Sequence, residues 1–265
     1  MAIRSEAPAY SQSLERGLAI LSAFRSGRPL LGVSELGREI GLSRSTTHRY
    51  VATLARLGYL QQDAVTRRYR LGPRVLDLGF SAINSMELRE VAAPHLRRLS
   101  DETGFTVNLG ILDGADVVYV ERCRSAQRRQ REIDLDLHVG SRLPAYCTSL
   151  GKVLLAFLPR AEQAETMMGI ELVRRGPHTI TSRSALTAEL KRVRETGFAT
   201  NNEELAYGLR SIAAPVLSRD GVAVAAINLA VHSSMVSLEE LAARLLGPLQ
   251  AAAAEISANL GYRAD

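Results

Sequence analysis

The stretch VSELGREIGLSRSTTHRYVATLARLG, residues 33–58, decides the fold of the N-terminal part of the chain. It predicts two short helices with a tight turn between them. Gly41 is placed to end the first helix, because glycine adopts the left-handed backbone conformation at little cost. Ser34 and Ser43 are expected to cap the two helices, since a serine hydroxyl accepts hydrogen bonds from the free amides of a first turn. The pattern is typical of a helix-turn-helix.

The second of these helices is expected to have a buried side and an exposed side. Residues at helical spacing form the inward stripe: Thr47, Tyr50, Val51, Leu54 and Leu57. Polar and basic residues near its N-terminus face outward: Ser43, Arg44, Ser45, Thr46, His48 and Arg49. In a helix-turn-helix this end of the second helix meets base edges in the major groove. Arginine donates two hydrogen bonds to guanine, and hydroxyls reach bases or phosphates, so we expect these residues to bind double-stranded DNA.

The flanking segments extend this element to a winged helix-turn-helix. Upstream, SLERGLAILSAF (residues 13–24) predicts a first helix whose apolar face consists of Leu14, Leu18, Leu21 and Phe24. Downstream, residues 58–72 predict two short strands around a polar turn. Arg67 and Arg68 are expected in or beside this wing, within reach of phosphate or the minor groove.

The charge is distributed unevenly along the chain. Residues 1–75 contain 12 arginines, no lysine and 5 acidic residues, which gives a net charge of +7. The remaining residues contain 21 basic and 23 acidic side chains, a net charge of −2. A basic module on a near-neutral body suits phosphate binding. The alternatives, ordinary surface helices or a winged helix used for protein contacts, do not require this excess.

The length and composition limit the number of domains and the class of protein. A chain of 265 residues has room for two domains. Its two cysteines, Cys123 and Cys147, have no metal or redox spacing, and no signal peptide is evident, so we expect a cytoplasmic protein. No apolar run approaches the roughly 20 residues of a membrane span, so we expect no membrane partner. The five histidines are scattered, so we expect no metal site, and no motif indicates a cofactor.

The chain divides into three predicted parts. Residues 10–72 form the DNA-binding domain, residues 73–86 a linker helix, and residues 87–265 a second domain. The linker is apolar over more of its surface than one small domain requires, which indicates a possible dimer contact. In the second domain the pattern changes from helical to extended at Phe105. Helices flank predicted strands at 106–112, 117–123, 133–139, 212–217 and 222–231. Hairpin turns between them indicate an antiparallel sheet and the α+β class.

The search for catalytic chemistry finds no convincing constellation, so we do not expect an enzyme. Cys147 near Lys152 is a candidate nucleophile, which leaves a ligand-processing enzyme with a DNA-binding domain as the alternative, although a buried structural thiol is the more common case. Short polar residues in apolar surroundings are more informative: Tyr146, Thr148, Ser149, Asn201, Ser211 and Asn228. Together they suggest a small-molecule cavity, with an anion site at the helix that begins near Gly151.

Four segments together resemble the IclR family of bacterial transcription regulators over nearly the full chain. They are SLERGLAILSAF, SELGREIGLSRSTTHRYVATLARLGYL, LPAYCTSLGKVLLAFLP and GFATNNEELAYGLRSIAAPV. The resemblance implies a winged helix-turn-helix, a linker helix and a GAF-like effector domain with an antiparallel sheet. It also implies homodimers that often pair into dimers of dimers. PRVLDLGF and the last segment are similar to the branch that controls β-ketoadipate, protocatechuate and hydroxybenzoate catabolism.

The resemblance implies a set of ligand-binding positions in the second domain: Tyr146, Thr148, Ser149, Leu150, Asn201, Ser211, Asn228 and Ala230. Two of them depart from the family pattern, because Asn201 replaces an aspartate or serine and Ala230 lacks a hydroxyl. We expect a small carboxylated effector, aromatic or derived from an aromatic ring, that alters binding to a palindromic operator. The candidate partners of its carboxylate are Arg142, Arg210 and residues 128–131.

Overall fold

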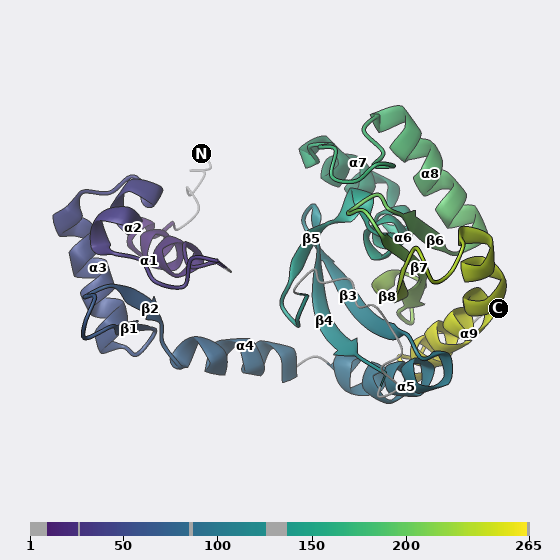
Figure 1. Cartoon of the computed structure of the whole chain (residues 1–265), viewed down its shortest axis with the longest axis horizontal. Helices are drawn as coiled ribbons and strands as arrows, with labels where there is room; N and C mark the ends of the chain where they lie inside the picture. The colour runs from purple at the N-terminus through teal and green to yellow at the C-terminus, as the bar shows by residue number, and fades with distance from the viewer. Residues whose placement is uncertain (1–9, 26, 85–86, 126–136, 264–265) are drawn as a thin grey trace, which may run out of the picture. The chain divides into compact units, whose positions relative to one another are not determined.

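The computed structural model of the chain describes residues 10–25, 27–84, 87–125 and 137–263 (Figure 1). These residues form two compact units, 1–85 and 86–265. The first unit contains α1 (Gln12–Ser22), α2 (Val33–Ile40), α3 (Arg44–Arg56), the antiparallel hairpin of β1 (Leu60–Gln62) and β2 (Tyr69–Leu71), and α4 (Arg74–Asn84). This arrangement is the predicted winged helix-turn-helix followed by a helix.

Local hydrogen bonds explain why the helices of the first unit begin and end where they do. Gly41 ends α2 in the left-handed conformation, with φ of 69°. Ser43 caps α3, and its hydroxyl accepts a hydrogen bond from the amide of Thr46. The prediction for Ser34 is wrong, because Gly32 is the N-cap of α2. The carboxylate of Glu35 accepts the Gly32 amide at 2.7 Å, which replaces a serine cap.

The core of the first unit differs from the predicted one at three leucines. Its fully buried side chains include Ile20, Leu36 and Val51. Leu14 and Leu18 on α1 are 64% and 55% exposed, and Leu57 just after α3 is 45% exposed. The helical repeat brings Ile20 and Ala23 toward the core, whereas Leu14 and Leu18 lie on another side of α1. The predicted apolar stripes were therefore too wide for so small a core.

The second unit is built on one six-stranded antiparallel sheet with the order β5-β4-β3-β8-β7-β6. Its elements are α5 (Glu87–Thr103), β3 (Thr106–Asp113), β4 (Asp116–Cys123), β5 (Arg142–Pro144), a 3-10 turn (Ala145–Cys147), α6 (Ser149–Phe157), α7 (Arg160–Gly169), α8 (Arg183–Thr196), β6 (Ala199–Asn202), β7 (Leu209–Leu217), β8 (Ala223–His232) and α9 (Leu238–Asn259). The predicted α+β class is confirmed.

Helices cover both faces of this sheet and create two apolar cores (Figure 1). On one face, α5 and α9 pack against alternate residues of the central strands, such as Ile227 and Leu229 of β8. On the other face, α6 and α8 pack against the residues in between, such as Ala226. Strand alternation separates the two faces, so Asn228 lies on the same face as Ala226, the face that α6 covers.

Two strands of the second unit differ from the sequence prediction. The short strands β5 and β6 form its two edges and were not predicted, since neither has an apolar alternation of useful length. Most of the strand predicted at 133–139 lies outside the described residues, and its last residues, from Leu137, form no strand. No helix of the described residues is long and apolar enough to cross a membrane.

The tight packing of α6 yields a stability test. A Cβ added to Gly151 would lie 2.2 Å from backbone atoms of Ala145, which cannot move as a flexible side chain would. We expect Gly151→Ala to lower the free energy of unfolding by about 1–3 kcal/mol, as overpacking does. Gly169→Ala is the control, because nothing lies within 4 Å of its added Cβ. Urea denaturation of both variants measures this, and equal stabilities would refute the tight approach of α6.

Candidate functional site

The N-terminus of α3 presents a compact group of hydroxyls. Ser43 Oγ accepts the Thr46 amide at 3.2 Å and lies within hydrogen-bond distance of Thr46 Oγ1 and Ser45 Oγ, at 2.9 and 3.1 Å. Thr47 faces the other way and is fully buried, with its hydroxyl donating to the Ser43 carbonyl at 2.9 Å. The cap therefore holds the first turn of α3 rigid and leaves its outer face to solvent.

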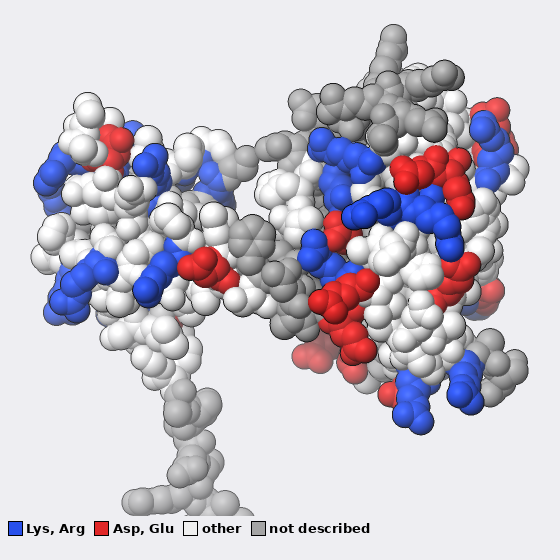
Figure 2. All heavy atoms as spheres, turned by 90° about the horizontal axis from the view of Figure 1, so that it is seen from below, with Lys and Arg blue, Asp and Glu red and all other residues white. Residues whose placement is uncertain are grey.

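Four exposed side chains follow on this outer face: Arg44, Ser45, His48 and Arg49. Positions separated by four residues lie on the same side of a helix, so these residues form one continuous surface. On the view in Figure 2, Lys and Arg groups outnumber Asp and Glu on the first unit, whereas both kinds are mixed on the second. The surface has the size and charge of an element that enters a major groove.

The two arginines predicted in or beside the wing, Arg67 and Arg68, have different surroundings in the structure. Arg67 is exposed in the turn between β1 and β2, with a left-handed φ of 59°. Arg68 instead pairs with Glu35 of α2 at 2.5 Å. The hydrogen bond from the Gly32 amide and the bond from Arg68 together lower the pKa of Glu35. The guanidinium of Arg68 thus fastens the wing to α2, and a contact of Arg68 with DNA stays a prediction.

In the second unit, strand pairing places the predicted ligand residues in two rows across the face that α6 covers. One row passes from Arg122 on β4 through Asn108 on β3 to Asn228 on β8. The neighbouring row is formed by Thr106, Ala230, Ser211 and Asn201, on β3, β8, β7 and β6. The antiparallel register thus unites residues that are distant in the sequence.

The polar side chains of these rows form one hydrogen-bonded chain, which we call the polar row. Arg122 donates to Asn108 Oδ1 at 3.1 Å, and Asn108 Nδ2 donates to Asn228 Oδ1 at 2.8 Å. Asn228 Nδ2 donates to Ser149 Oγ at 3.4 Å, and Ser149 and Ser211 share a bond of 2.7 Å. Asn108, Ser149, Ser211 and Asn228 are all buried. Moving four polar side chains from water into an apolar core costs free energy of desolvation. The hydrogen bonds of the polar row offset that cost.

The other predicted ligand residues surround the polar row. Thr148 caps α6 and accepts the Gly151 amide at 3.1 Å. Leu150 is fully buried in the apolar core, and the Tyr146 hydroxyl donates to the Val173 carbonyl at 2.5 Å. Asn201 donates to the Cys147 carbonyl at 3.0 Å and accepts the Glu204 amide at 2.9 Å. These contacts fix the loop before α6 against β6.

Three important side chains were missed in the sequence. Asn108 and Arg122 complete the polar row. Asn108 carries the same signal as Asn228, a lone amide in an apolar strand, and could have been found by it. Lys152, which lies on α6, is only 1% exposed. The apolar residues around it on α6 are a signal for burial, but its two partners lie far along the chain and could not be found from the sequence.

Lys152 forms a buried ion cluster. Its Nζ lies 2.6 Å from Glu204 and 3.2 Å from Glu189 of α8. Burial raises the pKa of Glu204, although Lys152 opposes that effect. Burial also acts to raise the pKa of Glu189, but a hydrogen bond from Arg192 and the charge of Lys152 outweigh it, so this pKa is lowered. The cluster joins α6, α8 and the loop after β6.

The structure does not support Cys147 as a nucleophile. Its side chain is buried, and its thiol lies 3.7 Å from the Pro144 carbonyl. Burial raises the pKa of this thiol to about 12, so the thiol is protonated at neutral pH. The thiolate is the reactive form of cysteine. No group of three or more potential metal ligands occurs in the described part of the chain.

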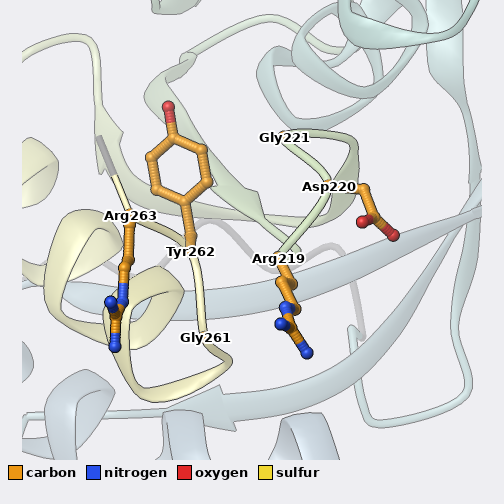
Figure 3. A pocket seen from close by; sticks show the side chains of 6 residues that line it. All are labelled: Arg219, Asp220, Gly221, Gly261, Tyr262 and Arg263. Atoms are coloured by element: carbon orange, nitrogen blue, oxygen red, sulfur yellow. The ribbon is translucent and has the colours of Figure 1, made fainter. Parts of the chain in front are cut away.

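A cavity of about 840 Å³ lies away from the polar row (Figure 3). It is formed by the turn between β7 and β8, residues 219–221, and by residues 261–263 after α9. In Figure 3 the side chains of Arg219 and Arg263 point one way and the ring of Tyr262 the other. None of the predicted ligand residues lines this cavity.

Two family profiles match the chain. One, described as the IclR helix-turn-helix domain, matches residues 13–64. The other, described as the C-terminal part of the bacterial transcriptional regulator IclR, matches residues 80–258. The chain belongs to the IclR family of bacterial transcriptional regulators. It is accordingly a DNA-binding regulator of transcription with a helix-turn-helix unit and an effector domain.

Individual IclR-family proteins are similar over nearly their whole length. The Pca regulon regulatory protein of Pseudomonas putida is 36% identical over 249 residues, 94% of this chain and 84% of that protein. The p-hydroxybenzoate hydroxylase transcriptional activator of Acinetobacter baylyi is 36% identical over 248 residues, 93% of this chain and 91% of that protein. A crystal structure of an IclR homolog from Microbacterium hydrocarbonoxydans, complexed with 4-hydroxybenzoate, has a TM-score of 0.79 at 27% identity and covers 94% of this chain and 99% of its own.

The Lys152 cluster gives a pH-dependent prediction. Lys152→Met leaves the buried carboxylate of Glu204 without its cation, whereas Glu189 keeps Arg192. We expect this loss to cost about 3–5 kcal/mol of unfolding free energy at neutral pH. The loss should be smaller near pH 5. Without Lys152 the pKa of Glu204 rises further above its unfolded value, and the carboxyl protonates and loses its charge as the pH falls.

The control for this variant is Lys191→Met, at the other lysine of the chain, whose side chain is 79% exposed. We expect the free energy of unfolding of Lys191→Met to differ from that of the wild type by at most about 0.5 kcal/mol. Urea denaturation at both pH values measures the two losses. A Lys152→Met variant as stable as Lys191→Met, or one whose loss grows toward acid, would contradict the role given to the cluster.

Proposed function

We propose that this regulator binds a palindromic operator as a homodimer and that a small carboxylated aromatic effector changes its operator affinity. In this proposal residues 10–72 bind DNA, residues 73–86 link the units, and residues 87–265 bind the effector. The protein acts in the cytoplasm, where a bacterial operator is located. The observation that carries the DNA-binding part is the exposed, basic outer face at the start of α3.

The DNA contacts follow from that face. Arg44 and Arg49 are exposed near the start of α3 and take base edges or the flanking phosphates in the major groove. Ser43, Ser45, Thr46 and His48 add shorter polar contacts. Arg67 at the tip of the wing reaches the adjacent backbone or minor groove. Arg68 acts indirectly, since its ion pair with Glu35 sets the position of the wing.

A homodimer explains the apolar surface that the first unit leaves uncovered. Four leucines of this unit are largely exposed: Leu14 and Leu18 on α1, and Leu76 and Leu78 on α4. Exposed apolar side chains in such number on a small unit indicate a contact surface. A two-fold dimer places two α3 helices in successive major grooves roughly 34 Å apart, and so reads a palindrome. Two such dimers could pair on adjacent sites.

The polar row supports the effector part of the proposal. A buried set of amides and hydroxyls on an otherwise apolar sheet face is the composition of a small-molecule site. Similar proteins have names connected with p-hydroxybenzoate and the Pca regulon, and one homolog holds 4-hydroxybenzoate. The effector therefore replaces part of the hydrogen bonding of Ser149, Ser211, Asn228 and Asn201 beside the α6 N-terminus.

The DNA-binding surface is tested by Arg44→Ala combined with Arg49→Ala. Each base contact that is lost should cost about 1–3 kcal/mol, so we expect operator affinity to fall at least about tenfold, with a shallower salt dependence. Fluorescence anisotropy with the operator fragment measures both. Arg56→Ala, at the exposed far end of the same helix, serves as control. An unchanged affinity of the double variant, or a footprint without two-fold symmetry, would contradict the proposal.

The effector site is tested by thermal denaturation with 4-hydroxybenzoate and related aromatic acids. A ligand at about 100 times its Kd stabilises the folded state by about 2.7 kcal/mol, so we expect a clear rise in Tm. Ser211→Ala should reduce that rise, whereas Ser218→Ala, beyond the end of β7, should leave it unchanged. If no aromatic acid raises Tm, the aromatic assignment is wrong and the DNA-binding part stands.

A further inference from the structure

The polar row has a direction, which its first member imposes. A guanidinium donates hydrogen bonds and accepts none, so Asn108 must turn its oxygen toward Arg122. The amide nitrogen of Asn108 then faces Asn228 and donates to its oxygen. Asn228 in turn presents its nitrogen to Ser149. One donor-only group at the edge of the row thus fixes the orientation of two amides.

The row continues through the two hydroxyls. Ser149 Oγ accepts from Asn228, and the one other partner that the described residues offer it is Ser211, at 2.7 Å. Either hydroxyl could be the donor in this bond, and since Ser149 also accepts from Asn228, the two hydroxyls hold two protons but share only one bond. In both arrangements one hydroxyl proton of the pair has no acceptor among the described residues and is available to a ligand. The row consequently ends in a hydroxyl donor beside Ala230 and Asn201.

We propose that Arg122, acting through Asn108 and Asn228, is a positioning residue that makes the effector site a hydrogen-bond donor and so selects an oxyanion head group. This inference rests on the proposed function, since it concerns the same site. A carboxylate accepts hydrogen bonds with both of its oxygens and therefore matches a terminal donor. A carboxamide has one accepting oxygen and one donating nitrogen, so it matches that donor only when its oxygen faces it.

The arginines first considered for the carboxylate are engaged elsewhere or lie outside the described residues. Arg142 pairs with Asp113 at 2.7 Å and with Asp116 at 3.4 Å on an exposed edge. Arg210 donates to Asn202 and to the carbonyls of Ser233 and Val236. Residues 128–131 lie outside the described ranges. Arg122 is the arginine that the structure joins to the polar row.

The test compares two ligands that differ only in their head group. Isothermal titration with 4-hydroxybenzoate and with 4-hydroxybenzamide gives the ratio of the two affinities for each variant of the full-length protein. We expect Arg122→Met to weaken 4-hydroxybenzoate binding about 10- to 100-fold and to change 4-hydroxybenzamide binding about threefold at most. Arg122→Lys, which still only donates, should keep most of the ratio. Arg142→Met is the control and should leave the ratio of the two affinities unchanged.

A second variant protects the test against a folding defect. Asn108→Leu removes the second link but keeps the volume, and it should lower the same affinity ratio while Arg122 remains. Thermal denaturation without ligand identifies any variant that is not folded. If wild-type protein binds neither compound, the aromatic effector proposal fails. If it prefers the carboxylate and both Arg122→Met and Asn108→Leu keep that preference, the role of Arg122 is refuted and the proposed function stands.

Discussion

The effector unit depends on one constraint: every polar group that α6 carries into the interior must find a partner there. Residues 149–156 are all buried between the sheet and α8. Ser149 therefore requires Ser211 and Asn228, and Lys152 requires Glu204 and Glu189. These partners come from four other elements, so satisfying α6 fixes how the sheet, α8 and the loop after β6 are placed. The same demand concentrates hydrogen-bonding groups in an apolar core, which is what the proposed effector site needs to bind a small polar ligand.

The DNA-binding unit is organised by a smaller constraint of the same kind. Its core is small, and the wing is held both by the buried side chains of Leu60 and Tyr69 and by an ion pair to α2. Glu35 accepts the Gly32 amide and the Arg68 guanidinium, and in this way joins the start of α2 to β2. Arg44 and Arg49 of α3 and Arg67 of the wing are exposed, whereas the guanidinium of Arg68 is held in this ion pair. The arginine that holds the wing is thus different from the arginines that we propose as the main DNA contacts.

Much of this organisation is predictable from the sequence because it is encoded locally. The Ser43 cap, the Gly41 turn and the outward position of Arg44 follow from spacing and residue type alone. The roles of Arg68 and Lys152 could not be predicted, since each is decided by a partner 33 to 52 residues away. The leucines of α1 were misplaced for a related reason: periodicity identifies an apolar face but not whether the face meets the core or another copy. Asn228, Ser149 and Ser211 were singled out in the sequence as polar residues in apolar surroundings, but the direction of their hydrogen bonds depends on Arg122 and on strand register.

The central claim is that the two units are coupled, so that the effector and the operator change one another's affinity. The most direct measurement determines operator affinity with and without saturating 4-hydroxybenzoate, and 4-hydroxybenzoate affinity with and without saturating operator. Each pair of affinities gives one ratio, the affinity with the other ligand divided by the affinity without it. Linkage requires the two ratios to be equal, and regulation requires them to differ from one, typically by about 5- to 150-fold. Equal ratios of that size are the predicted result. Two ratios of one, with both ligands bound, would show that the site does not regulate the DNA-binding unit.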